Sequence, residues 1–121
     1  MFAFDFSGSG LSQGEYISLG YFEKDDLMAV VEYLRGLDSV SLIGLWGRSM
    51  GAATALLHGH RDPSIAAMVL DSPFTNLRIL AQELVYYHAK IPSFIASPGM
   101  YLVRNSIQDK AGFDIYELNP I

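Results

Sequence analysis

The chain has 121 residues, of which half are hydrophobic, and its 8 Lys and Arg against 13 Asp and Glu give a formal net charge of −5. This hydrophobic share argues against intrinsic disorder, and the length suits a single core, so we predict one folded domain over residues 1–121. The acidic balance offers no basic surface to neutralise phosphates, which argues against nucleic acid as a partner.

The absence of cysteine excludes disulfides, cysteine-ligated zinc and thiol catalysis. Apolar stretches are interrupted before they reach the roughly 18 residues that a membrane-spanning helix needs. The N-terminus also shows no basic segment ahead of an apolar one. We therefore expect a cytoplasmic protein with no membrane span.

The first part of the chain predicts a strand, a loop and a helix. Residues 2–6, FAFDF, are short and aromatic and lead into the glycine-rich SGSGLSQG, as a strand leads into a loop. In residues 23–37, apolar side chains recur every three or four positions. Acidic residues occupy the first turn of this predicted helix, where the helix dipole favours carboxylates.

Two further strands are predicted on either side of a short helix. Residues 40–47, VSLIGLWG, are apolar on successive positions, as expected of a strand buried on both faces of a sheet. A helix over about residues 50–58 follows. Residues 65–72, IAAMVLDS, form the next buried strand, which Pro73 ends.

The rest of the chain predicts helices, over residues 76–88 and over part of 93–107, with a break or kink at Pro98 and Gly99. Strands that alternate with helices imply parallel strands joined by right-handed crossovers, and thus a three-layer α/β core. Because the chain begins in a predicted strand and stops soon after helices that should lead into another, we expect this core to be truncated at both ends.

The pattern G-x-S-x-G occurs twice, as GLSQG around Ser12 and as GRSMG around Ser49. A nucleophile elbow needs a buried strand directly before the serine and a helix directly after it, and only Ser49 has both. The serine of an elbow lies in a strained turn, so Gly47 and Gly51 are expected to leave room where strand and helix approach each other. The backbone N–H of Met50, at the helix N-terminus, would be one donor for an oxyanion. This setting favours Ser49 as a nucleophile over an ordinary turn serine.

From FAFDFSGSGLSQGEY through GLWGRSMGAATALL to MVLDSPF, the chain resembles the middle of an α/β-hydrolase of the serine-aminopeptidase-like and Bem46-like group. In that family a strand ends in an Asp that opens a D-x-x-G-x-G-x-S loop, matched here by Asp5, Gly8, Gly10 and Ser12. The resemblance implies that Ser49 is the nucleophile and Met50 a backbone oxyanion donor. It also implies hydrolysis of an ester, thioester or amide in a small-molecule or peptide substrate, through an acyl-enzyme.

The resemblance also implies groups that residues 1–121 do not match. The family's triad runs in the order Ser, then Asp or Glu, then His, with acid and base after strands that would follow residues 65–72. A strand ending in an H-G motif, whose loop supplies the second oxyanion donor, would precede Met1. We therefore expect this chain alone to be a weak or absent catalyst, because an unactivated hydroxyl is a poor nucleophile.

Local residues offer one candidate acid and no base. Asp71 ends the strand after the elbow, where some lipases place their acid; the alternative is a carboxylate that caps the following turn. His58 lies about 13 Å from Ser49 along the intervening helix, at 1.5 Å per residue, too far for a hydrogen bond. His60 is farther still, and His88 has no positional match to the family's base. No base is assigned.

We predict neither a metal nor a cofactor. HGHRD, with His58, His60 and Asp62, imitates metal-ligand spacing but falls at a helix end, which favours a solvated terminus. The glycines after FAFDF have the spacing G-x-G-x-x-x-G, and no helix opens directly from them, so a nucleotide cradle is not favoured. Trp46, beside the elbow, is assigned to packing instead of substrate binding.

Two classes of function stay open. The first is a serine hydrolase of the esterase or peptidase type. The second is a degenerate, non-catalytic hydrolase core that acts as an interaction module. In both cases uncovered sheet edges would favour self-association.

Overall fold

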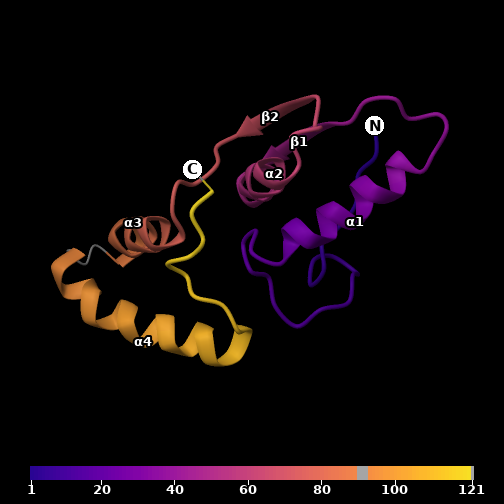
Figure 1. The fold of residues 1–121 in the computed structure, drawn as a ribbon. Helices are drawn as coiled ribbons and strands as arrows, with labels where there is room; N and C mark the ends of the chain where they lie inside the picture. Colours follow the sequence, from indigo (N-terminus) through magenta and orange to yellow (C-terminus); the bar gives the residue numbers. More distant parts are fainter. Residues whose placement is uncertain (90–92, 121) are drawn as a thin grey trace. The chain divides into compact units, whose positions relative to one another are not determined.

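The computed structural model describes residues 1–89 and 93–120, and the chain divides into two compact units, Met1–Pro73 and Phe74–Ile121, which we describe separately. The first unit contains α1 (Glu23–Arg35), β1 (Gly44–Arg48), α2 (Met50–Arg61) and β2 (Ala67–Asp71) (Figure 1). The second contains α3 (Leu77–Ala89) and α4 (Ser93–Ala111). The predicted helices, and the two predicted strands on either side of α2, are confirmed, but β1 begins four residues later than the predicted strand over residues 40–47.

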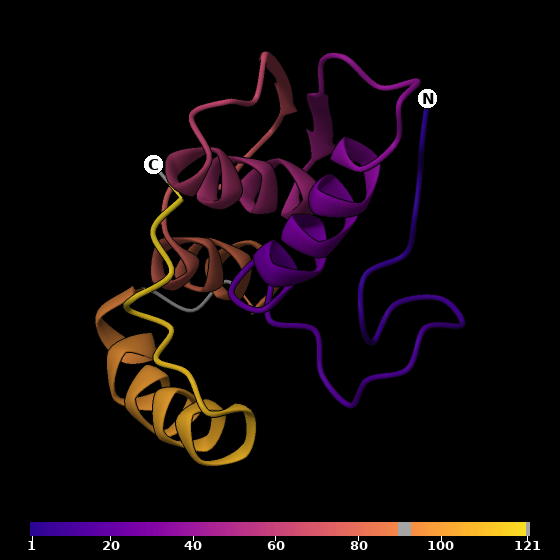
Figure 2. The ribbon, with the colours of Figure 1, turned by 45° about the vertical axis from the view of Figure 1, so that its right-hand side comes forward.

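Helices α1 and α2 pack against each other in the first unit (Figure 2). Leu27 and Val31, one turn apart on α1, are buried, as the apolar periodicity predicts. Two ion pairs link α1 with the end of α2 and the residue after it, each with 2.8 Å between nitrogen and oxygen: Arg61 with Asp25, and Arg35 with Asp62. The helix pair therefore combines an apolar contact with charges at its rim.

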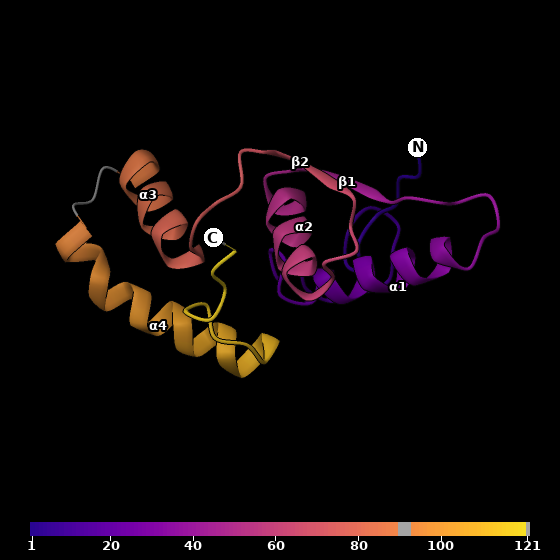
Figure 3. The same ribbon diagram turned by 45° about the horizontal axis from the view of Figure 1, so that its top comes forward.

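Strands β1 and β2 form a parallel two-stranded sheet, and α2 packs against both strands (Figure 3). Trp46 pairs in register with Val69, and the Trp46 side chain is 74% exposed. The expectations of strands buried on both faces and of a packing role for Trp46 are therefore wrong for the described residues. A parallel strand is buried on both faces only where helices cover both, and in the first unit α2 covers one.

Residues 2–6, predicted as a strand, form none in the structure. A strand exists only where a neighbouring strand takes up its backbone N–H and C=O groups. Here the Phe6 carbonyl accepts a hydrogen bond from Ser9 N–H at 3.0 Å, which begins a turn instead of a ladder. The described core is thus a small parallel sheet with helices, which is consistent with an α/β fold, and the full three-layer core stays a prediction.

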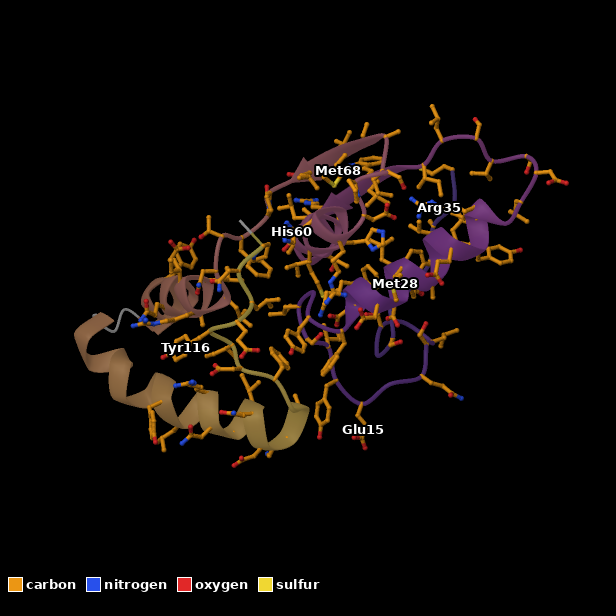
Figure 4. The ribbon with its side chains drawn as sticks, in the orientation of Figure 1. Glu15, Met28, Arg35, His60, Met68 and Tyr116 are labelled. Carbon is orange, nitrogen blue, oxygen red and sulfur yellow. The ribbon has the colours of Figure 1, made fainter. Side chains whose placement is uncertain are left out.

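In the second unit, the C-terminal segment Phe113–Leu118 returns toward the start of α3 (Figure 1). Leu77 N–H donates to the Leu118 carbonyl at 3.3 Å, and Phe113, Ile115 and Leu118 are buried. Arg104 on α4 holds Asp114 through hydrogen bonds, which keep the pKa of that carboxyl below its usual value. The Arg104 guanidinium also lies 4.5 Å from the ring centroid of Tyr116, which Figure 4 labels.

Helix α4 is a single helix of 19 residues that includes Pro98 and Gly99, so a break there is wrong, and the alternative of a kink stays a prediction. A proline removes one backbone N–H donor, and the other hydrogen bonds of a helix this long continue on both sides. Within the described part of the chain, no helix is both long and apolar enough to cross a membrane.

Candidate functional site

Ser49 lies between the last residue of β1 and the first residue of α2, with φ 50° and ψ −114°. The strand before it and the helix after it are confirmed. A positive φ on a residue other than glycine is a strained backbone, and it costs roughly 1–3 kcal/mol. Such a conformation persists only where its surroundings hold it.

Two backbone hydrogen bonds hold Ser49. Its N–H donates to the Asp71 carbonyl of β2 at 2.8 Å, and its own carbonyl accepts from Ala53 N–H at 3.0 Å. The first bond continues the ladder of the sheet, and the second opens the ladder of α2. The turn is therefore fixed at one end by the sheet and at the other by the helix.

Gly47 is the glycine that lets strand and helix come together. A Cβ built on Gly47 would stand 2.3 Å from the carbonyl carbon and oxygen of Gly51 and 2.6 Å from the nitrogen of Ala52. A Cβ built on Gly51 meets nothing within 4 Å. The expectation that both glycines are needed for the close approach is thus confirmed for Gly47 and wrong for Gly51, because only the strand glycine points its missing side chain at the helix.

The side chain of Ser49 is exposed and does not cap α2. A serine at a helix N-cap normally accepts a hydrogen bond from the first turn, so this one is unusual. The first N–H groups of a helix have no acceptor within the helix, and Met50 N–H is among them. An exposed hydroxyl and an N–H without an acceptor in its own helix thus lie one residue apart at the carboxyl ends of β1 and β2.

Asp71, the candidate acid, ends β2 beside Ser49, but its carboxylate has other partners. Oδ1 accepts from the Ser72 hydroxyl at 2.8 Å, and Oδ2 lies 3.3 Å from Nε of Arg48, its register partner on β1. Both charged side chains are largely exposed, so the pair contributes little to stability. These contacts resemble the turn-capping alternative more than an acid that holds an imidazole.

The described histidine side chains do not lie beside Ser49. His58 is 2% exposed, and its Nε2 lies 3.4 Å from Asp62 Oδ2 without the geometry of a hydrogen bond. His60, near the end of α2, is exposed (Figure 4). The side chain of His88 lies outside the described residues. The part of the chain that the structure describes therefore offers no base at the serine.

The HGHRD stretch does not gather metal ligands. Among the described side chains, no three of His, Cys, Asp or Glu come close enough to hold an ion. Asp62 instead accepts hydrogen bonds from the Ser64 hydroxyl and from Ser64 N–H. These bonds and the Arg35 guanidinium keep the pKa of Asp62 below its usual value against the opposing effect of burial.

The glycine-rich loop after FAFDF closes on itself. Gly8 N–H donates to the Gln13 carbonyl at 3.0 Å, and the Asp5 carboxylate lies against Gly10. Asp26 of α1 then fastens the loop by accepting from both the N–H and the hydroxyl of Ser7, at 2.8 and 3.0 Å. A cradle for a phosphate would need these N–H groups free and no carboxylate against the loop.

Two features of the site are missed from the sequence. The Arg48–Asp71 pair depends on the register of two strands that are 19 residues apart in the chain, and no local pattern predicts that register. The other is a buried cluster of Ser18, Gly20 and Glu23 next to α2. Its serine stands five residues before the glutamate, so the capping box S-x-x-E does not find it.

The family model for serine aminopeptidase S33 matches residues 1–111. The chain is 40% identical to the uncharacterized protein YqkD of Bacillus subtilis (strain 168) over 124 aligned positions, which cover 98% of this chain and 39% of that protein. No solved structure gives a significant match. By the extent of the family match, the chain belongs to the serine aminopeptidase S33 family of the α/β-hydrolase superfamily.

Proposed function

We propose that the chain carries the nucleophile of a serine hydrolase of the esterase or peptidase type, and that Ser49 is this nucleophile. The observation that carries the proposal is the strained backbone of Ser49, which exposes a hydroxyl free of helix capping at the end of a strand. Strain at a residue other than glycine is concentrated at functional sites. Membership of a hydrolase family supports the same reading.

In the proposed reaction, Ser49 Oγ attacks the carbonyl carbon of an ester, thioester or amide. Its proton passes to a base, the carbonyl oxygen becomes an oxyanion, and Met50 N–H donates to that oxygen. The bond to the leaving group then breaks, and the leaving group takes up a proton. Water hydrolyses the acyl-enzyme, which releases the acid and restores the serine.

The proposal assigns no base and keeps Asp71 as a candidate acid. Asp71 is joined to Ser49 through its backbone carbonyl, but its carboxylate pairs with Arg48 and Ser72. It could orient an imidazole only after leaving these partners. Because His58 is buried some nine residues along α2, we expect weak reactivity from residues 1–121 alone.

A second candidate function is a non-catalytic hydrolase core that acts as an interaction module. The observation that favours it is the sheet face on which Trp46 and Val69 are exposed side by side. Apolar residues that gather on a surface indicate a binding face. The open edges of the same sheet would favour self-association.

A fluorophosphonate probe and an activated ester, used on three forms of the chain, test the proposal. We expect the wild-type chain to be labelled and Ser49→Ala to be silent. Ser12→Ala, a matched change in the other G-x-S-x-G stretch, should be labelled like the wild type. Equal signals from the wild type and Ser49→Ala would reject the nucleophile and leave the interaction module.

A further inference from the structure

A buried hydroxyl on α2 reaches the turn that carries Ser49. Residues 52–55 are almost fully buried, and three of them are alanines; the fourth, Thr54, is 0% exposed. Thr54 Oγ1 donates to the Met50 carbonyl at 2.8 Å. A buried hydroxyl costs free energy unless it is bonded, and this hydrogen bond satisfies the Thr54 hydroxyl among its apolar neighbours.

The loop before α1 passes close to Thr54 at Gly20. A Cβ built on Gly20, where φ is 119°, would stand 3.5 Å from Thr54 Oγ1, 3.6 Å from Thr54 N and 3.1 Å from Leu57 Cδ1. The loop therefore passes so close to α2 that even a methyl group at Gly20 would be in van der Waals contact with Thr54 and tight against Leu57. The positive φ of Gly20 strains any side chain there as well.

Glu23 fixes the loop in this place. Its carboxylate is buried, at 2% exposed, and accepts from Ser18 N–H at 2.7 Å, from Gly20 N–H at 2.8 Å and from the Ser18 hydroxyl. A buried carboxylate is tolerated when donors surround it in this way. The loop is thus a rigid support for α2, held from the first turn of α1.

We infer that Thr54 is a positioning residue for Ser49 and Met50. This inference rests on the proposed function of Ser49 as the nucleophile. The Thr54 hydroxyl fixes the Met50 carbonyl, and the loop at Gly20 packs close beside Thr54. These contacts stabilise the first turn of α2. A strained backbone such as that of Ser49 persists only where the surrounding structure holds it in place. The hydrogen bond from Thr54 to the Met50 carbonyl thereby keeps the Ser49 hydroxyl and the Met50 N–H in a fixed position relative to each other.

The competing explanation is that the Thr54 hydroxyl bonds the Met50 carbonyl only because a buried hydroxyl needs an acceptor. Buried Ser and Thr side chains often bond the carbonyl four residues back for this reason. Under that explanation the methyl group of Thr54 matters for packing and the hydroxyl does not matter for Ser49. Thr54→Val keeps the shape and removes the hydroxyl, whereas Thr54→Ser keeps the hydroxyl and removes the methyl. The two explanations therefore predict opposite orders for this pair of variants.

The experiment measures amide hydrogen exchange at Ala53, whose N–H donates to the Ser49 carbonyl, together with the rate of fluorophosphonate labelling. For Thr54→Val we expect Ala53 to exchange about fivefold to tenfold faster, the loss that one neutral hydrogen bond represents. Labelling should slow by about tenfold, because small misplacements of reacting groups are costly. Thr54→Ser should restore both values, and exchange at Val31 on α1 should stay unchanged.

Each outcome decides the inference. An unchanged Ala53 in Thr54→Val overturns it, whatever the labelling shows, and so does a Thr54→Ser protein that behaves like Thr54→Val. If the wild type is not labelled but amide exchange at Ala53 becomes faster in Thr54→Val as expected, the structural role of Thr54 is supported and the proposed function of Ser49 fails. If Thr54→Val does not fold, Thr54→Ala must show the same faster exchange at Ala53 for the inference to hold.

Discussion

Two stretches of the first unit share the pattern G-x-S-x-G but place their strain on different residues. In GLSQG the positive φ angles fall on the glycines, 57° at Gly10 and 146° at Gly14. In GRSMG the positive φ falls on the serine, 50° at Ser49, and on neither glycine. A left-handed glycine costs little, whereas a left-handed serine is strained. The residue that carries the positive φ therefore distinguishes GRSMG from GLSQG, and this difference supports the proposed role of Ser49.

The two serine hydroxyls differ in the same way. Ser12 Oγ donates to the Asp5 carbonyl at 3.2 Å, so it closes the loop in which it lies. Ser49 Oγ makes no capping bond to the helix that it precedes. One serine thus serves its own loop, and the other presents its hydroxyl to the surroundings. Changes at the glycines and serines of both stretches can break or sharpen this contrast.

The largest effect is expected for Gly47→Ala. The new methyl would lie 2.3 Å from backbone atoms of Gly51, which cannot move aside without separating β1 from α2. We expect a loss of about 3 kcal/mol or more in the free energy of unfolding, the upper range for overpacking. Urea unfolding measures it, with Gly51→Ala as the matched control, which should be neutral or stabilising by up to about 1 kcal/mol. Equal losses in both variants would mean that strand and helix meet differently.

The sequence predicts the local setting of Ser49 because each part of it is local. An apolar run, a glycine, a serine and an alanine-rich run are enough to place a strand, a turn and a helix in order. The choice of GRSMG over GLSQG follows from the same neighbours. Of the two serines, Ser49 has a strand directly before it and a helix directly after it in the structure, and Ser12 has neither. The family resemblance, carried by these stretches, is likewise confirmed.

The features that the sequence does not predict depend on residues far apart in the chain. FAFDF has the composition of a strand, but strand formation needs a partner and Phe6 bonds into a turn instead. Trp46 is apolar, but its exposure depends on whether a helix covers that face of the sheet. Asp71 is placed correctly at the end of β2, yet its pairing with Arg48 follows from strand register. Local patterns contain none of this information.

Gly14→Ala tests whether GLSQG needs glycine at a position where the backbone has a positive φ. A Cβ at Gly14 would stand 2.5 Å from the nitrogen of Gly8, at a φ of 146° that side chains rarely allow. We expect a loss of about 2 kcal/mol, from the strain together with the opening of the loop. Gly10→Ala is the milder control, at about 1 kcal/mol, because its new methyl meets only the end of the exposed Asp5 side chain. Thermal unfolding of both variants gives the order, and a larger loss at Gly10 would contradict it.

Ser49→Gly should raise stability, which is the opposite sign to ordinary replacements by glycine. Glycine adopts a φ of 50° without the clash that serine suffers, and the Ser49 side chain makes no capping bond that would be lost. We expect a gain of about 1 kcal/mol in the free energy of unfolding, with complete loss of probe labelling. Urea midpoints measure the first effect. A less stable Ser49→Gly protein would show that the serine backbone is not strained, and would remove the main support for its proposed role.

The smallest effect is expected for Ser12→Ala. The variant loses the exposed hydrogen bond from the Ser12 hydroxyl to the Asp5 carbonyl, so stability should fall by about 0.5 kcal/mol, the low end for one such bond. Ser12→Gly should cost more, because glycine also adds freedom to the unfolded chain at a position with no positive φ. Replacement by glycine would then destabilise one serine of the pattern and stabilise the other, measured in the same chain by the same unfolding curve. If both serines respond with the same sign, the backbone difference between the two stretches does not separate a loop serine from a nucleophile.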